Sequence, residues 1–336
     1  MKENKRKSTQ LLFGFAGAAA LTAGAAVLAK RNEELKRETE EKKFSPPGEM
    51  VDVDGKRMHV LITDPPETAA KPSPVIVMLP GYGTSGPSLD FLPLARKLAE
   101  KGFRCVSPEP FGYGFSDDTD KPRTADLMID EIRVALCKLQ IPTPFILLGH
   151  SIAGFYIRIW ADRYPEEICG LVGVDNSVPE QMEAMKNELK LYKILHVIDS
   201  VMQKASPFGL DRIFIENSSV LKRSAHNDPD ILPLLRYAAR KSKYSKAVVD
   251  ESTHFAEAAE QTAACPLPAC PFLIFVATGK GSASQVKFKC GFSWLQAHHD
   301  LANSLTNGKA VELPGMHYLH WDYAERMAEE IASMFL

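Results

Sequence analysis

One serine stands between small residues in a setting suited to acyl transfer. Ser151 lies in the hexapeptide GHSIAG (residues 149–154), after an apolar run at residues 145–148 and before a helical pattern at residues 155–164. A sharp strand-to-helix turn strains the backbone, so only small residues fit close to its centre. The turn exposes the hydroxyl and directs the N–H groups of the following helix towards it. We therefore expect Ser151 to be a nucleophile, although Ala153 stands where a second Gly is usual.

Three further loops accompany the serine turn in a defined order. Residues 79–83 (LPGYG) and 110–117 (PFGYGFSD) precede it, and residues 315–318 (GMHY) lie near the end of the chain. With these motifs, residues 50–336 resemble the α/β-hydrolase superfamily, especially its cap-bearing branch of short esterases and aminopeptidases. The resemblance implies a mostly parallel β-sheet with helices on both faces and a Ser–His–acid triad.

A nucleophilic serine needs a base within hydrogen-bond reach. His317 follows a strand-like run at residues 310–313 and lies on a Pro-Gly loop, the place where the resemblance implies the base. His320 is the competitor, but its position favours packing at the start of the last helix. The resemblance also implies a structural role for His150.

The acid has two possible positions. The commonest one in the superfamily follows strand seven, here residues 272–277, but no carboxylate occurs after it until Asp300. The other follows strand six, where Asp175 ends the apolar run at residues 168–174. We therefore expect Asp175 to orient His317 and stabilise its imidazolium form. Asp300 is the rival acid, and the alternative role for Asp175 is to cap the next segment.

An oxyanion hole needs two backbone donors directed at the developing negative charge. The resemblance implies that Ile152, directly after the nucleophile, supplies one N–H group and that Tyr82 supplies the other. Pro80 replaces the histidine that is usual in this loop, a supporting residue rather than a catalytic one. No phosphate-cradling loop or metal-ligand spacing occurs, so we predict neither a cofactor nor a metal.

Alternating strand and helix patterns must position these loops. Two strand-like runs join at Asp54-Gly55, which predicts a hairpin. Helical periodicity follows at residues 89–101 and 124–139. Such alternation predicts an α/β fold, a mostly parallel sheet with helices on both faces, and a site at the carboxyl ends of the strands.

The predicted organisation has a core interrupted by a cap. Residues 49–177 and 269–336 form the predicted hydrolase core, and residues 178–268 form a helical cap inserted after strand six. The cap reads as helices because its apolar residues recur at helical spacing, and its underside is expected to line an acyl pocket. The expected cap helices cover residues 179–205, 210–217, 228–243 and 246–264.

The N-terminal region differs from the rest. Residues 1–10 are a basic tail, residues 11–29 are an uncharged run of membrane-spanning length, and residues 30–48 are a charged linker. We expect the run to be a transmembrane or signal-anchor helix, with a cleaved signal peptide as the rival. The basic flank then predicts a single-pass membrane protein with an extracytoplasmic catalytic domain.

Three functions fit these features. The first is a membrane-anchored serine hydrolase that cleaves a carboxylic ester, or a related acyl bond, of a small-molecule substrate through an acyl-enzyme. The second is an aminopeptidase-type enzyme, which needs an acidic cluster such as Glu180, Glu183 and Glu188 to hold a free amine. The third is a non-catalytic ligand-binding protein, disfavoured because all three triad candidates are present. The net charge of −2 and the pI of about 6.5 do not indicate a nucleic-acid partner.

Overall fold

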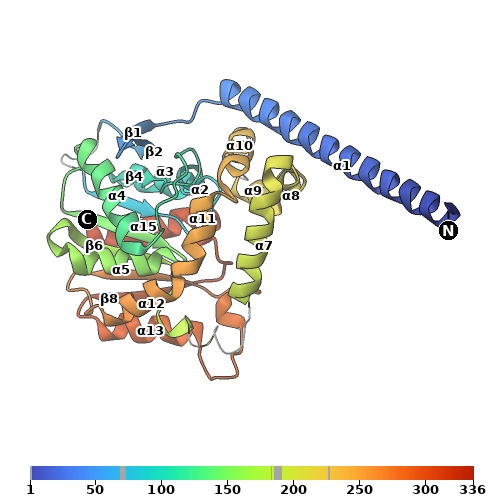
Figure 1. Ribbon diagram of the computed structural model, residues 1–336. Coiled ribbons are helices and arrows are strands. Elements are labelled where there is room, and N and C mark those ends of the chain that lie inside the picture. Colours follow the sequence, from blue (N-terminus) through green and yellow to red (C-terminus); the bar gives the residue numbers. More distant parts are fainter. Residues whose placement is uncertain (1, 69–72, 183, 185–190, 226–227) are drawn as a thin grey trace.

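An eight-stranded sheet forms the centre of the molecule (Figure 1). The computed structural model describes residues 2–68, 73–182, 184, 191–225 and 228–336, with side chains described from residue 23 onward except at residues 191, 192 and 195. The strands are β1 (Glu49–Val53), β2 (Lys56–Thr63), β3 (Val75–Leu79), β4 (Arg104–Pro108), β5 (Phe145–His150), β6 (Ile168–Val174), β7 (Phe272–Ala277) and β8 (Gly308–Leu313). Their order is β1-β2-β4-β3-β5-β6-β7-β8. Only the pairs β1–β2 and β2–β4 are antiparallel, so the predicted mostly parallel sheet is confirmed.

The first two strands form the predicted hairpin. Val53 pairs with Lys56, and the two residues between them are Asp54 and Gly55. Their φ angles are 54° and 78°. Positive φ at both central residues is characteristic of the two-residue hairpin turn that matches the right-handed twist of the strands. The local sequence therefore determines this turn.

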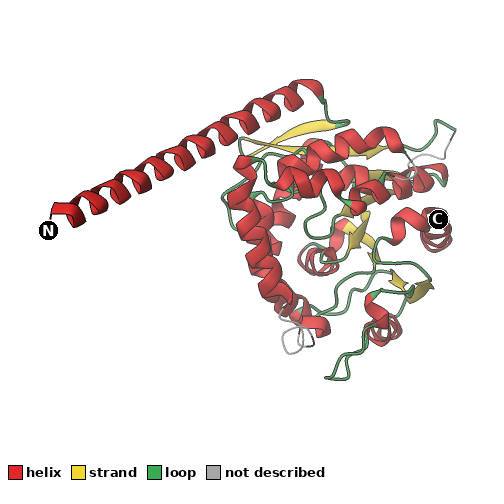
Figure 2. Ribbon diagram, turned by 90° about the vertical axis from the view of Figure 1, so that its right-hand side faces the viewer, coloured by secondary structure: helices red, strands yellow, loops and turns green. Residues whose placement is uncertain are grey.

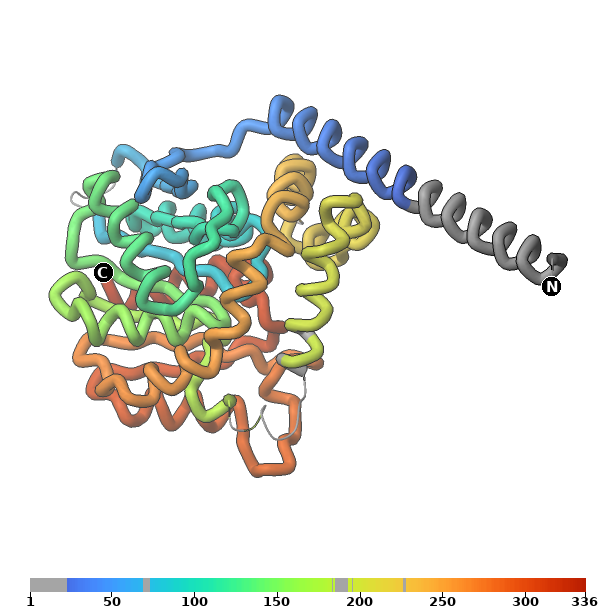
Figure 3. The backbone as a smooth tube through the Cα atoms, viewed as in Figure 1, coloured from blue at the N-terminus to red at the C-terminus, as the bar shows by residue number. Residues whose placement is uncertain are grey.

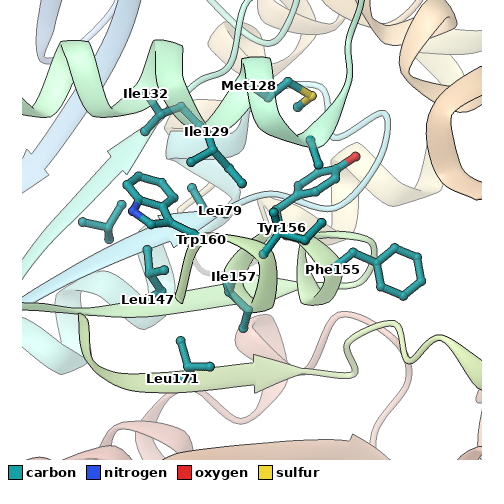
Figure 4. Packing of buried hydrophobic residues seen from close by; sticks show 14 of the residues in the cluster. Leu79, Met128, Ile129, Ile132, Leu147, Phe155, Tyr156, Ile157, Trp160 and Leu171 are labelled. Carbon is teal, nitrogen blue, oxygen red and sulfur yellow. The ribbon is translucent and has the colours of Figure 1, made fainter. Parts of the chain in front are cut away.

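Helices cover both faces of the sheet, and Figure 2 shows the strands enclosed between them. Adjacent strand residues point to opposite faces, so Val77 and Leu147 join one core cluster while Ile76 and Leu148 join the other. The first cluster packs under α4 (Ala125–Lys138), α5 (Ala153–Arg163), α12 (Phe255–Ala264) and α13 (Trp294–Ser304). The second packs under α3 (Leu92–Glu100), α14 (Leu319–Asp322) and α15 (Ala324–Phe335). Figure 4 shows Trp160 and Tyr156 of α5 packed between α4 and the sheet.

The predicted cap after β6 is helical. Its described helices are α7 (Leu191–Ala205), α8 (Asp211–Asn217), α9 (Ser219–Ser224), α10 (Leu232–Ser242) and α11 (Lys246–Glu251), followed by α12. Part of the first expected cap helix, with Glu183 and Glu188, lies outside the described residues. A separate buried cluster joins the cap to the hydrolase core, and it includes Leu89 and Phe115 of the core with Ile215 and Leu235 of the cap.

The prediction of a membrane-spanning helix over residues 11–29 was wrong. Among the described residues, no helix is both long enough and apolar enough to cross a bilayer. α1 (Lys2–Lys43) continues past residue 29 into the charged run that begins at Lys30. The predicted single-pass membrane localisation, the extracytoplasmic catalytic domain and the membrane contact through this helix are wrong for the same reason.

The charged segment after residue 29, which we had expected to be a linker, contacts the cap. α1 lies beside α8 and α10 in Figures 1 and 3. Arg212 of α8 binds Glu33 at 2.6 Å and Glu40 at 2.7 Å, and Arg240 of α10 also binds Glu40, at 3.1 Å. Phe44 stacks on Tyr237, with ring centroids 5.3 Å apart. Residues 33–44 are therefore part of the folded unit.

Glu33 should contribute to stability in a pH-dependent way. Its side chain is buried, and although burial raises its pKa, hydrogen bonds from Arg212 and Arg37 lower that pKa below its ordinary value. A group with a depressed pKa stabilises the fold above its unfolded pKa, and this contribution is lost as the pH falls through the folded pKa. Glu33→Gln should therefore lower the free energy of unfolding at pH 7 by about 2 kcal/mol, because the guanidinium groups of Arg212 and Arg37 lose a buried counter-charge.

Urea unfolding at pH 7 and at acidic pH measures this effect, and the difference from the wild type should shrink in acid. The matched control is Glu34→Gln, since Glu34 forms an exposed pair with Arg31 at 3.3 Å and should change stability by less than about 0.5 kcal/mol. Equal effects of the two substitutions would show that residues 33–44 do not dock on the cap.

Candidate functional site

Ser151 stands on a strained turn at the end of β5. Its φ is +56°, a left-handed conformation that non-glycine residues rarely adopt. Three backbone hydrogen bonds hold it there: its N–H donates to the Val174 carbonyl at 3.1 Å, and its carbonyl accepts from Ser177 at 2.7 Å and Gly154 at 3.0 Å. The turn is thus fixed by the end of β6 and by the first residues of α5. Such fixed strain is a feature of functional turns.

The small residues around Ser151 are sterically required. A Cβ atom on Gly149 would lie 2.8 Å from the Ala153 carbonyl oxygen, and one on Gly154 would lie 2.6 Å from the Ser177 carbonyl oxygen. Ala153 stands where the usual pattern has glycine, and its small side chain is buried in the first turn of α5. The motif at residues 149–154 therefore works as a tight strand-to-helix connection.

Asp175 directly follows β6 and is completely buried. One carboxylate oxygen, Oδ1, accepts hydrogen bonds from the Trp294 indole N–H at 2.9 Å and the Ala277 amide at 3.1 Å. The other, Oδ2, lies 2.7 Å from Nδ1 of His317. These contacts bring together the two residues predicted as acid and base. The rival acid Asp300 instead lies on α13, where it accepts a hydrogen bond from Gln296 at 2.8 Å.

A second contact fixes His317 through its main-chain carbonyl group. Its carbonyl oxygen accepts a hydrogen bond from Nε2 of His150 at 3.0 Å, and the two imidazole rings lie 4.6 Å apart. Burial, together with the neighbouring His317 and His320, lowers the pKa of His150 well below its ordinary value. His150 is therefore neutral and acts as a donor that positions the histidine loop.

The competitor His320 has a different partner. Its Nε2 lies 2.7 Å from Oδ2 of Asp90, which also accepts the Trp321 indole N–H on Oδ1 at 3.1 Å. His320 is fully buried, as the prediction of a packing role requires. The imidazole of His317, by contrast, is about 40% exposed and is accessible to a bound molecule.

The loop after β3 lies against the serine turn. A Cβ atom on Gly81 would stand 3.0 Å from Cβ of Ser151, so only glycine allows this approach. Within the described chain, the amide N–H groups of Tyr82 and Ile152 donate to no internal acceptor. Two unused donors on loops in direct contact can serve an external oxygen. Within the same residues, the Ser151 hydroxyl forms no hydrogen bond with His317, a contact that often closes only when substrate binds.

The cap fixes the loop after β3 through two acidic residues. Asp199 of α7 accepts a hydrogen bond from the Tyr82 hydroxyl at 2.7 Å. Glu251 of α11 accepts hydrogen bonds from the hydroxyls of Tyr113 and Tyr156, and the Tyr113 oxygen in turn accepts the Gly83 amide at 3.2 Å. Burial raises the pKa of Glu251 despite these hydrogen bonds.

Sequence reasoning missed the residues that support the site. Trp294, Asp199 and Glu251 occur in no recognisable motif, and each reaches its partner across more than ninety residues of chain. A partial signal existed for Trp294, because an aromatic residue with a polar tip near an expected active site often donates a hydrogen bond when buried.

Comparisons with known proteins agree with this architecture. Residues 74–206 match the family model described as the alpha/beta hydrolase fold. The uncharacterized protein YbdG of Bacillus subtilis is 32% identical over 139 residues, 41% of each chain. A proline iminopeptidase of Thermoplasma volcanium is 26% identical over 171 residues, 48% of this chain and 58% of that protein. The chain therefore matches less than two thirds of the length of these relatives.

Solved structures show the same fold at low sequence identity. A thioesterase domain from the curacin biosynthetic pathway has a TM-score of 0.54 at 17% identity and covers 86% of this chain and 100% of its own. A thermophilic esterase from Thermogutta terrifontis has a TM-score of 0.57 at 18% identity, with 84% and 95% coverage. An enol-lactonase from Burkholderia xenovorans has a TM-score of 0.53 at 18% identity, with 85% and 99% coverage.

The close packing around Gly149 at the serine turn should make the protein less stable when this glycine is replaced. Gly149→Ala should lower the free energy of unfolding by about 1–3 kcal/mol, because the added methyl group overlaps the first turn of α5. Chemical denaturation measures the loss. Gly24→Ala is the control, since a Cβ atom there meets nothing within 4 Å and alanine in a helix should gain about 0.5–1 kcal/mol. An unchanged stability of Gly149→Ala would mean that the turn is wider than described.

Proposed function

We propose that this chain, which has the α/β-hydrolase fold, is a serine hydrolase that cleaves a carboxylic ester or a related acyl bond. Ser151 is the nucleophile, His317 the base and Asp175 the acid. The observation that carries the proposal is the 2.7 Å contact between His317 and the buried Asp175, on loops that follow β8 and β6. Structural neighbours described as an esterase, a thioesterase domain and an enol-lactonase support acyl chemistry.

The reaction begins with proton transfer from Ser151 to Nε2 of His317 as the serine oxygen attacks the acyl carbon. Asp175 stabilises the imidazolium through Nδ1, and the amides of Tyr82 and Ile152 donate to the oxygen of the tetrahedral intermediate. The imidazolium then gives its proton to the leaving alcohol, which leaves an acyl group on Ser151. Water, activated by the same histidine, attacks the acyl carbon and releases the acid.

A second candidate function is removal of an N-terminal residue from a peptide. The similarity to a proline iminopeptidase favours it. Such an enzyme must hold a free amine with carboxylates, and Glu180 is exposed and lines a separate cavity of about 630 Å³ beside α13. Comparing p-nitrophenyl esters of varied chain length with proline p-nitroanilide separates the two activities. Preferential cleavage of the anilide would assign the peptidase function.

Ser151 should react with a fluorophosphonate probe, because the proposed base and oxyanion donors activate its hydroxyl. Mass spectrometry of the labelled protein should place one adduct on the peptide that contains Ser151, and Ser151→Ala should remain unlabelled. Ser177→Ala is the matched control, because Ser177 is a buried serine that follows Asp175 on the same loop, and its substitution should leave the adduct in place. A folded wild-type protein without an adduct would contradict both the hydrolase and the peptidase proposals, and would favour a non-catalytic binding protein.

Asp175→Asn should reduce kcat/KM for p-nitrophenyl esters by about a thousandfold or more, because an amide donor favours the wrong histidine tautomer. Asp300→Asn changes the rival carboxylate in the same way and should leave the rate within about twofold, because this exposed group has Gln296 as its one hydrogen-bond partner among the described residues. Steady-state kinetics measure both variants, and circular dichroism checks the fold. A large loss in Asp300→Asn with near-normal turnover in Asp175→Asn would transfer the acid role to Asp300.

A further inference from the structure

A cavity of about 280 Å³ lies between the cap and the candidate site. Its core side is formed by Tyr82 and Gly83 of the loop after β3 and by Tyr318, which follows His317. Its cap side is formed by α8, α9 and α10 and by the residues after α10. Tyr82 adjoins Gly81, whose backbone lies against Ser151, so the cavity begins one residue from the contact between this loop and the serine turn.

Lys243 brings a positive charge into the cavity. It is partly exposed and lines the cavity at the end of α10. Its Nζ lies 5.8 Å from the ring centroid of Tyr244, and within the described chain no hydrogen bond or ion pair reaches it. Burial lowers the pKa of Lys243, although Asp199 opposes that change. Because the described residues give Lys243 no hydrogen-bond or ion-pair partner, the N–H donors of its ammonium form are available to a ligand.

The acidic residues of the cavity are already engaged by donors. Asp90 accepts from His320, Trp321 and, at 3.3 Å, from Ser224. Asp199 accepts from the Tyr82 hydroxyl. Lys243 is thus the group in the cavity lining whose N–H donors an anion can satisfy.

The rest of the cavity wall is apolar. Phe214 and Val220 of the cap line it and are more than 45% exposed, and Leu235 lies buried beside them. We propose that an acyl group on Ser151 extends into this cavity along these side chains, and that the enzyme prefers acyl substrates with a carboxylate at the far end of the acyl chain, which Lys243 binds. This inference rests on the proposed serine-hydrolase function and names its substrate class.

Kinetics with two esters of equal chain length test the inference. The substrates are p-nitrophenyl hydrogen adipate, which ends in a carboxylate, and p-nitrophenyl hexanoate, which ends in a methyl group. The ratio of their kcat/KM values, anionic over neutral, should fall at least about tenfold in Lys243→Met, because a charge-assisted hydrogen bond is lost. Lys243→Arg should retain most of the wild-type ratio, since it keeps the charge.

Lys222→Met is the matched control. Lys222 is an exposed lysine of α9 in the same cap, so its removal deletes the same charge outside the cavity and should leave the ratio unchanged. Lys243→Gln serves if Lys243→Met does not fold. An unchanged ratio in the folded Lys243 variant, even with lower rates on both esters, would overturn the inference and assign Lys243 to the support of Asp199.

The wild-type rates separate this failure from failure of the proposed function. If the wild type hydrolyses the hexanoate ester but the Lys243 substitutions do not change the ratio of kcat/KM values, only the anion preference is refuted. Absence of turnover on both esters by folded wild-type protein refutes the ester-hydrolase function and, with it, the substrate class.

Discussion

The buried carboxylate of Asp175 is the interaction around which the candidate site is organised. A negative charge without solvent is costly unless hydrogen bonds replace its hydration. Here the donors come from three separate elements: the Ala277 amide at the end of β7, the indole of Trp294 at the start of α13, and the His317 ring on the loop after β8. Satisfying one carboxylate therefore fixes the positions of several segments that are distant in the sequence.

The backbone at Asp175 and at Ser151 shows the same constraint. Both residues have positive φ angles, 42° and 56°, and both are tied to neighbouring strands by main-chain hydrogen bonds. Strain of this kind persists only where the surroundings over-determine the conformation. The core packing on both faces of the sheet provides that rigidity, while the cap contributes through Asp199 and Glu251, which hold the loop after β3. The cap is thus a structural part of the site as well as a wall of its cavity.

Local features were predictable from the sequence because their causes are local. The hairpin at Asp54-Gly55 and the turn around Ser151 each depend on a few adjacent residues with special backbone needs. The supporting contacts were not predictable, because Trp294 meets Asp175 through packing of elements that lie 119 residues apart. The same holds for Lys243, whose access to the cavity depends on how the cap sits over the core.

In the N-terminal region, the sequence led to a wrong prediction. Composition alone suggested a membrane-spanning helix and a charged linker, whereas the structure gives one helix whose last turns are paired with Arg212 and Arg240 of the cap. Alternating charges predict helix formation well, but they do not reveal whether the partners of those charges are water or protein. The contacts of Glu33 and Glu40 depend on the tertiary fold, which a window of sequence does not contain.

The pairing of His317 with Asp175 is tested most directly by the proton NMR spectrum of the histidine ring N–H groups in water, assigned by their loss in His317→Gln and His320→Gln. We expect a strongly deshielded Nδ1 proton on His317 that disappears in Asp175→Asn, while the His320 proton, which faces Asp90, stays unchanged as an internal control. A His317 resonance that persists in Asp175→Asn would contradict the pairing of these two residues and the catalytic triad built on it.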